Sequence, residues 1–405
     1  MRFRPLAFFA RITYYNRMST FISGAYDYKR HNAEVQLVME RFGDNNPVRA
    51  PLHVHGSITN YFFNPELNTR GYTFEQFFKD PEIHIRAQLE YQNWVRHNVV
   101  CDREMGLPDS WQLSVDFQNS YDASWAGAPM AFFDGQLPDT LPIFAENREK
   151  LYDMPKILPV DGGAVGDGMA FADYMAGRCK SFEYMGRPVT PPTRYLGENC
   201  DGAFDLAYKL RGAENLIYDM LDEDGYYEDL MDWITDNLIR RMRALRAMRR
   251  ERPGGAPGFS YADDAIALIS HDMYKKYVLP YHRRFFDAFA DGQKCGVHFC
   301  GACMHHFGEL VKELPINAID TGFPVDHGLL RELTGPDITL YTGPTVMLLK
   351  DGAPAQIRAE AKRILESGVT RGGKYVMIAA NNMAPQTPVE NVMALYEAVK
   401  VYGRY

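Results

Sequence analysis

The sequence predicts a (β/α)8 TIM barrel with an N-terminal extension and long loop insertions at its C-terminal face. From about residue 47 onward, short apolar runs alternate with longer amphipathic stretches. This alternation is typical of parallel strands covered by helices. Seven or eight such units in a chain of 405 residues favour a closed barrel over an open sheet, because single barrels reach this length when they carry insertions.

The apolar runs give the order of the predicted strands. From the N-terminal side they are APLHVHG, WQLSVDF, GFSYADD, CGVHFCG, NAIDTG, ITLYTGP and YVMIAANN, and LGENCDGAF is predicted to contain a further strand end. Helical periodicity marks several of the connecting stretches, such as APAQIRAEAKRILESG. Residues 118–195 are rich in glycine and proline, which indicates insertions near the active face and not a separate domain.

Two units are predicted along the chain: an N-terminal extension over residues 1–46 and the barrel domain over residues 47–405. The apolar run LAFFA near the start is shorter than a signal peptide requires. We interpret the first residues as a tail, or as a start site assigned too early with Met18 as the alternative. No apolar run approaches the ~20 residues that span a bilayer, so we expect a cytoplasmic protein.

Charge and cysteine content narrow the class of function. A formal net charge of -8 and a pI near 5.8 give no attraction to nucleic acid or to an anionic membrane. We therefore expect no nucleic-acid partner and no membrane partner, but a small-molecule substrate. Six cysteines are too few for a disulfide framework and indicate a reducing compartment.

The stretch GVHFCGACMHHFG carries the clearest chemical signal. His298 and Cys300 are two residues apart, so on a strand both side chains face the same way. An imidazole and a thiolate are suitable zinc ligands, and Asp320, at the end of the next predicted strand, is a candidate third ligand. Two alternatives stay open: a buried strand end without metal, and a redox pair of Cys300 with Cys303.

Polar residues at other strand ends are expected to meet at the C-terminal mouth of the barrel. In YADDAIALIS, adjacent carboxylates precede a predicted helix, and we take Asp263 and Asp264 as catalytic candidates for acid–base chemistry, although either one is also suited to capping the helix. Candidate substrate-binding residues at the remaining strand ends are His55, Glu198, Asn199, Asn381 and Asn382. For the histidine and the loop residues, ordinary structural roles are the alternative.

The second half of the chain resembles the uroporphyrinogen decarboxylase superfamily. The resemblance rests on YADDAIALIS, MYKKYVLPYHRRFFDAF, VHFCGACMHHFGELVKELPINAID, ELTGPDITLYTGP and APQTPVENVMALYEAV. It runs from about residue 195 to the end and more loosely from residue 47. It implies a (β/α)8 barrel. The superfamily also contains zinc-dependent methyltransferases that work with corrinoid proteins and coenzyme M.

Two departures place the chain nearer the methyltransferase branch than true uroporphyrinogen decarboxylase. The decarboxylase branch has an arginine-rich segment after the first strand, whereas VHGSITNYFFNPELNT has no arginine to grip substrate carboxylates. The methyltransferase branch has a His-x-Cys pair, matched by His298 and Cys300, and a later cysteine. Alignment on APQTPVEN puts Asn381 at that cysteine, so Asp320, Cys303 or another carboxylate would have to complete a zinc site.

The leading hypothesis is a methyltransferase component that moves a methyl group between a small O- or N-methylated substrate or acceptor and a separate corrinoid protein. A metal or an acid in the barrel mouth would activate the substrate. An oxygen ligand makes zinc a harder Lewis acid, which suits a substrate oxygen or nitrogen better than a thiolate. The alternatives are a decarboxylase acting on a small carboxylic acid and a non-catalytic small-molecule-binding barrel. A homodimer is compatible with the sequence.

Overall fold

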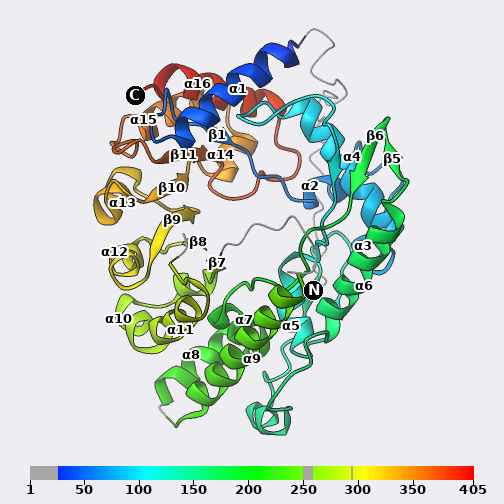
Figure 1. The fold of residues 1–405 in the computed structure, drawn as a ribbon. Helices are drawn as coiled ribbons and strands as arrows, with labels where there is room; N and C mark the ends of the chain where they lie inside the picture. Colours follow the sequence, from blue (N-terminus) through cyan, green and yellow to red (C-terminus); the bar gives the residue numbers. More distant parts are fainter. Residues whose placement is uncertain (1–25, 223, 250–258, 293–294) are drawn as a thin grey trace, which may run out of the picture.

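Six parallel strands form a curved wall around the centre of the molecule (Figure 1). The computed structural model describes residues 26–222, 224–249, 259–292 and 295–405. Hydrogen bonding gives the strand order β1-β11-β10-β9-β8-β7, and every neighbouring pair is parallel. The strands of the wall are β1 (Leu52–His53), β7 (Phe259–Ala262), β8 (Cys295–Phe299), β9 (Ile316–Thr321), β10 (Thr339–Thr342) and β11 (Tyr375–Ile378).

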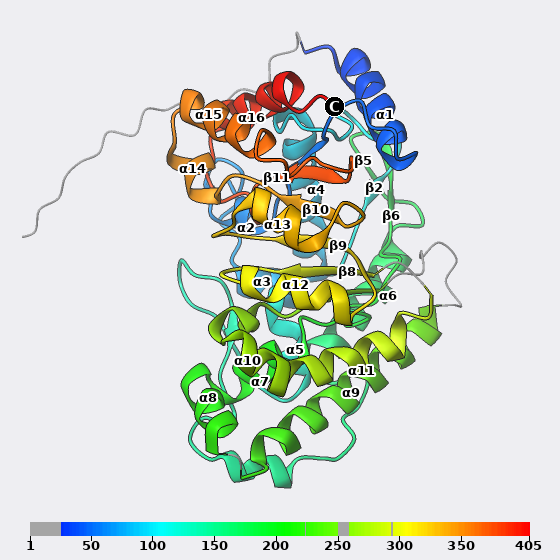
Figure 2. The same cartoon turned by 90° about the vertical axis from the view of Figure 1, so that its left-hand side faces the viewer.

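Helices cover the outer face of this wall (Figures 1 and 2). Such an arrangement follows from parallel strands, because each connection must return to the start of the next strand. The helices from residue 203 onward are α7 (Ala203–Arg211), α8 (Ala213–Asp222), α9 (Tyr226–Arg249), α10 (His271–Met273), α11 (Leu279–Phe289), α12 (Met304–Glu313), α13 (His327–Thr334), α14 (Val346–Asp351), α15 (Pro354–Leu365) and α16 (Val389–Tyr402).

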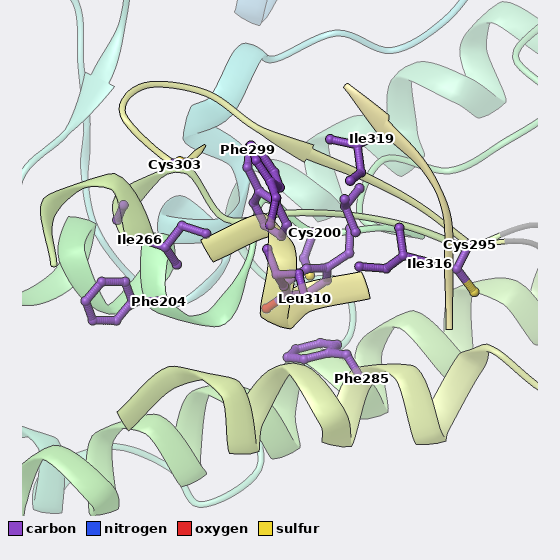
Figure 3. Packing of buried hydrophobic residues seen from close by; sticks show 14 of the residues in the cluster. Cys200, Phe204, Ile266, Phe285, Cys295, Phe299, Cys303, Leu310, Ile316 and Ile319 are labelled. Carbon is purple, nitrogen blue, oxygen red and sulfur yellow. The ribbon is translucent and has the colours of Figure 1, made fainter. Parts of the chain in front are cut away.

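The alternation of side chains along β8 separates the hydrophobic core from the site. Val297 and Phe299 are buried on the helix side of the strand, whereas His298 points the other way and is partly exposed. On the helix side, Figure 3 shows Phe285 of α11 reaching toward Leu310 of α12, with Ile316 of β9 near them. Burial of Val297 and Phe299 therefore fixes the strand, and with it the position of His298.

Residues 59–190, which include most of the predicted insertions, build a second layer with its own apolar core, on the far side of the barrel centre in Figure 1. This core packs residues such as Phe77, Trp111, Phe117 and Met175. The elements of this part are α2 (Thr59–Phe62), α3 (Phe74–Lys79), α4 (Pro81–Asn98), β2 (Trp111–Gln112), α5 (Tyr121–Trp125), β3 (Met130–Ala131), β4 (Asp139–Thr140), α6 (Gly163–Arg178), β5 (Glu183–Tyr184) and β6 (Arg187–Thr190).

Each of the seven apolar runs contains a strand, but two details of the prediction are wrong. In WQLSVDF only β2 is a strand, and it pairs with β6 in a separate sheet of order β2-β6-β5. Around LGENCDGAF, residues 191–202 contain no strand. Gly197 and Gly202 have φ of +88° and +108° there, a backbone conformation that does not fit a strand.

Gly202 lies where this segment passes close to the end of β7. An added Cβ would lie 2.3 Å from the carbonyl oxygen of Ala262, and its φ is already in the region that favours glycine. We expect Gly202→Ala to lower the free energy of unfolding by at least about 2 kcal/mol. Gly135→Ala is the matched control: its φ is +69° but nothing lies within 4 Å, so we expect about 1 kcal/mol. Urea unfolding followed by circular dichroism measures both, and equal losses would contradict the steric argument.

The described part of the N-terminal extension packs onto the barrel. Helix α1 (Tyr28–Gly43) lies beside α16 in both views (Figures 1 and 2). Glu34 of α1 accepts hydrogen bonds from Arg49 at 3.3 Å and from Lys400 at 2.7 Å. The prediction for the first residues, including Met18 as a start, lies outside the described residues. Within those residues, no helix combines the length and the apolar character that crossing a membrane requires.

Candidate active site

A polar cavity of about 340 Å³ lies at the carboxyl ends of the strands. Six of the ten predicted site residues line it: His55, Asp264, His298, Asp320, Asn381 and Asn382. The other lining residues are Asn119, Asp201, Asp205 and Ala262. Cys300, also a predicted residue, directly follows β8 and contacts the His298 side chain. The barrel mouth therefore gathers side chains that are more than 300 residues apart in the sequence.

Three donor atoms from two neighbouring strand ends lie close together beside this cavity. Cys300 Sγ lies 3.0 Å from His298 Nε2, and that nitrogen lies 3.9 Å from Asp264 Oδ1. One ligand atom from each of the three residues lies within 4.8 Å of the others. Tetrahedral zinc with N, O and S ligands places neighbouring donor atoms roughly 3.3–3.8 Å apart. The three side chains therefore suit a zinc ion in number and chemistry, and the two distances of 3.0 and 3.9 Å lie just outside this range.

Asp320 faces the other nitrogen of the same imidazole. Its Oδ2 lies 3.4 Å from His298 Nδ1, because His298 and Asp320 are direct neighbours in the register of β8 and β9. A carboxylate on the second nitrogen of a ligating histidine fixes the ring and its tautomer. Asp264, predicted as a catalytic residue, thus groups with His298 and Cys300, whereas Asp320, predicted as the third ligand, contacts the other nitrogen of His298.

Asn381 contacts the sulfur of the pair. Its amide Nδ2 donates a hydrogen bond to Cys300 Sγ at 3.2 Å, and its Oδ1 accepts one from the backbone N–H of Asn382 at 2.7 Å. The second hydrogen bond fixes the orientation of the amide. The residue that stands where the methyltransferase branch has a cysteine therefore remains next to the candidate metal ligands.

The pKa values of His298, Cys300 and His55 are shifted in this site. Burial opposes the charge of His298, but its hydrogen bonds with Asp320 and Cys300 outweigh burial and raise the pKa of His298 to about 11. Burial raises the pKa of the Cys300 thiol, although the contact with His298 acts against the change. Burial also lowers the pKa of His55, which lines the same cavity. His55 is therefore a neutral donor or acceptor at neutral pH.

Asp263, predicted to be catalytic, does not line the cavity. It is fully buried, and its carboxylate accepts hydrogen bonds from the backbone N–H groups of Phe204 and Asp205 at 3.2 and 2.7 Å. Asp205 in turn accepts hydrogen bonds from the N–H groups of Asp264 and Ala265 at 3.0 and 2.6 Å. Asp263 thus caps α7, which contains Asp205. Asp205 in turn caps the short 3-10 helix η3 (Asp264–Leu268), which directly follows Asp263.

The predicted substrate-binding residues Glu198 and Asn199 also lie outside the cavity lining. Glu198 is buried and accepts a hydrogen bond from the backbone N–H of Tyr195 at 2.8 Å. The Asn199 side chain accepts a hydrogen bond from Arg246 Nη2 at 2.7 Å and lies 3.3 Å from Ser260 Oγ. The irregular backbone of residues 191–202 turns these two side chains away and brings Asp201 to the cavity instead.

Three polar residues of the lining were not predicted as site residues: Asn119, Asp201 and Asp205. Asp201 follows Glu198 and Asn199 in the same predicted strand end, so its neighbourhood was visible in the sequence. Asp205 lies in the first turn of α7, where an acidic residue is typical of an ordinary helix start. Asn119 also lines an adjoining cavity of about 580 Å³, together with Asn381 and Asn382.

The side chain of Cys303, the other cysteine of CGAC, contacts the backbone and not the His298 side chain. Its Sγ donates a hydrogen bond to the carbonyl oxygen of Cys300 at 3.0 Å, and the residue is fully buried. Burial and the nearby carboxylates raise the pKa of its thiol well above the ordinary range. All six cysteines are free. A thiol held neutral in this way is not a reactive redox group.

Comparison with known proteins gives a family match and several relatives. The sequence family described as Uroporphyrinogen decarboxylase (URO-D) matches residues 193–402. A uroporphyrinogen decarboxylase of Syntrophotalea carbinolica is 28% identical over 228 residues, which cover 55% of this chain and 60% of the relative. The methylcobamide:CoM methyltransferase MtbA of Methanosarcina mazei is 24% identical over 204 residues, which cover 50% of this chain and 56% of the relative. The chain thus spans somewhat more than half the length of these curated relatives.

A solved structure, a methyltransferase from Methanosarcina mazei, matches with a TM-score of 0.60 at 16% identity. The match covers 91% of this chain and 98% of that one. Together with the sequence match, this likeness confirms the predicted TIM barrel.

Proposed function

Because the chain belongs to the uroporphyrinogen decarboxylase (URO-D) family, whose relatives include a methylcobamide:CoM methyltransferase, we propose that it is a methyltransferase component. It moves a methyl group between a small methylated substrate or acceptor and a corrinoid carried by a separate protein. The observation that carries the proposal is the set of nitrogen, sulfur and oxygen donors of His298, Cys300 and Asp264 within one cavity. Residues 47–405 form the catalytic unit in this proposal.

Zinc is the metal that this donor set would hold. When bound, it supplies a Lewis acid that polarises the heteroatom from which the methyl group leaves or to which it goes. Asp320 orients His298 so that Nε2 faces the metal position. Asn381 donates its amide hydrogen to the Cys300 sulfur and so reduces the negative charge that the thiolate presents. Asp264 also accepts a hydrogen bond from the Cys300 N–H at 2.6 Å, which ties the two ligand-bearing strand ends together.

The cavity lining argues against a polycarboxylate substrate. Of the described residues that line it, none is an arginine or a lysine, and four are aspartates. Recognition of several carboxylates requires cationic donors, for which arginine is best suited. Decarboxylation of a porphyrinogen therefore lacks the groups that would bind its substrate here.

The contact between Asp320 and His298 leads to a prediction about the affinity for zinc. We expect Asp320→Asn to weaken zinc binding about 10- to 100-fold, because the second nitrogen of His298 loses its carboxylate partner. Competition with a chromogenic chelator measures the zinc affinity. Asp351→Asn, an exposed residue at the end of α14, is the matched control and should leave the affinity unchanged. An unchanged affinity in Asp320→Asn contradicts the positioning role, and a loss as complete as in His298→Ala would make Asp320 a ligand instead.

Methyl transfer is tested with free cobalamin in place of the partner protein. Purified protein is mixed with cob(I)alamin and a panel of methoxylated and N-methylated compounds, and the absorption spectrum is followed for methylcobalamin. In the reverse arm, methylcobalamin is offered with coenzyme M or with amines as acceptors. Formation or consumption of methylcobalamin supports the proposal. Release of carbon dioxide from a small acid without any change at cobalt would favour a decarboxylase, and tight ligand binding without either reaction would favour a binding protein.

A further inference from the structure

A second, larger cavity adjoins the candidate active site. Its volume is about 580 Å³, and it shares three lining residues with the catalytic cavity: Asn119, Asn381 and Asn382. The two cavities therefore meet at these three side chains, which we call the boundary amides. A substrate longer than the catalytic cavity has space to continue past them.

Hydrogen bonds fix the two chain segments that carry the boundary amides. The N–H of Met383 donates a hydrogen bond to the carbonyl oxygen of His55 at 2.7 Å. In the other segment, Gln118 has a φ of +51°, which is uncommon for a residue other than glycine. Its backbone N–H and its side-chain amide both donate to Asp116 Oδ1, at 3.0 and 2.7 Å. These contacts hold a strained backbone directly before Asn119, and such strain is typical of ligand sites.

Two of the three boundary amides are free to bind a ligand. Asn381 donates to the Cys300 sulfur, but among the described residues the side chains of Asn119 and Asn382 have no hydrogen-bond partner. Both residues are exposed, so a ligand in either cavity reaches them. An amide side chain offers donors and an acceptor without a charge. The pair therefore suits a neutral group that donates and accepts, such as a hydroxyl group.

The lining of the larger cavity suits an apolar body without net charge. Its only charged residues, Lys209 and Asp139, lie 3.9 Å apart and balance each other. Its apolar residues include Leu137 and Phe323, which are 47% and 37% exposed. A ligand that covers these two side chains removes apolar surface from water.

We propose that the larger cavity holds the body of the methyl donor, and that this donor is an uncharged methyl ether with a hydroxyl group beside the ether and an apolar tail. The inference rests on the proposed function and names its substrate class: the methyl group is carried on oxygen. The hydroxyl group meets Asn119 and Asn382, and the tail covers Leu137 and Phe323. An ether oxygen keeps lone pairs for the Lewis acid of the proposed function. In the transfer the bond between methyl carbon and oxygen breaks, the methyl group bonds to cobalt(I), and the oxygen keeps the electron pair and takes a proton from solvent.

Four methyl ethers separate these features. The compound 1-methoxyhexan-2-ol has the hydroxyl group and the tail, 1-methoxypropan-2-ol lacks most of the tail, 1-methoxyhexane lacks the hydroxyl group, and 5-hydroxy-6-methoxyhexanoate ends in a carboxylate. Isothermal titration calorimetry with the full chain, run with and without added zinc, measures each affinity. We expect 1-methoxyhexan-2-ol to bind at least about tenfold tighter than the short ether, because three more methylene groups leave water. It should also bind about threefold or more tighter than 1-methoxyhexane, and about tenfold or more tighter than the carboxylate.

One variant tests the boundary amides. With Asn119→Ala and Asn382→Ala combined, the affinity for 1-methoxyhexan-2-ol should fall to about that for 1-methoxyhexane, while the advantage of the long tail over the short one remains. Asn46→Ala, which removes an exposed amide outside both cavities, is the control and should change neither ratio.

A second variant tests the apolar wall. With Leu137→Ser and Phe323→Ser combined, the advantage of the long tail should disappear, while the preference for the hydroxyl group remains. Leu141→Ser is the control, because Leu141 is 51% exposed but lines neither cavity. Circular dichroism checks that all variants fold, and the four ethers on the unaltered protein decide the question if a variant does not.

Several outcomes overturn the inference. Equal affinity for the long and the short ether, tighter binding of the carboxylate, or variants that change both ratios together each contradict it. The methyl-transfer assay fails separately. Methyl transfer from N-methylated compounds alone sinks the inference and keeps the proposed function, whereas the expected order of affinities without any methyl transfer keeps the binding site and sinks the proposed function.

Discussion

A variant that carries both His298→Ala and Cys300→Ala is expected to contain no zinc and to lose methyl transfer by about a thousandfold or more. Two of the three donors that meet in the cavity are then gone, and a single carboxylate does not retain zinc against buffer. The Lewis-acid contribution of such a metal is worth several kcal/mol in the transition state. Elemental analysis of protein purified without added zinc, together with the methylcobalamin assay, measures both effects.

The control for this variant is Cys179→Ala, which removes a free, partly exposed thiol at the end of α6. It should keep about one zinc per chain and full activity. An unaltered protein that contains no zinc, or a double variant that retains it, would contradict the assignment of the metal site. Activity that persists in zinc-free protein would leave the site in place but remove its catalytic role.

The second large effect concerns stability. Arg241 of α9 is fully buried and pairs with Asp122 of α5 at 2.5 Å. It also donates hydrogen bonds to the carbonyl oxygens of Gly197 and Asn199 at 3.3 and 3.2 Å, so it braces the segment that leads to Asp201. We expect Arg241→Met to lower the free energy of unfolding by about 3–5 kcal/mol, because a buried carboxylate loses its countercharge.

Arg284→Met is the matched control, since Arg284 also contacts two carboxylates, Asp232 and Asp236, each at 2.5 Å. Those pairs are exposed to water, so the expected loss is at most about 1 kcal/mol. Urea unfolding followed by circular dichroism compares the two variants. Similar losses in both would show that burial does not set the strength of the Arg241 pair.

The regular part of the fold was predictable because it repeats one physical pattern. In β8 the alternation of buried and inward-facing residues holds from Cys295 to Phe299, so the common direction of His298 and Cys300 followed from the sequence. The residues that lie beside them on the neighbouring strands could not be predicted from the sequence. That Asp320 stands beside His298 depends on the register of β8 and β9, which no local pattern encodes.

The errors lie where tertiary contacts decide the local backbone. The segment around Asp201 was predicted as a strand end, but Gly197 and Gly202 at positive φ and the buried Arg241 shape it into an irregular turn. In YADDAIALIS the sequence offered two equivalent carboxylates. Only the fold shows that Asp263 caps α7, which precedes it by some sixty residues, while Asp264 reaches the cavity.

The exchange of caps between Asp205 and Asp263 links two loops of the barrel mouth. Each carboxylate satisfies N–H groups of the other's loop, so opening either loop takes these backbone donors from both aspartates, while Asp263 keeps its contacts with Tyr261 and His282. The loops that carry Asp201 and Asp264 therefore form one cooperative unit, and their amide hydrogens should exchange with solvent at a common rate. A metal or a substrate held by either loop therefore slows the opening of both, so binding at one loop would reinforce binding at the other.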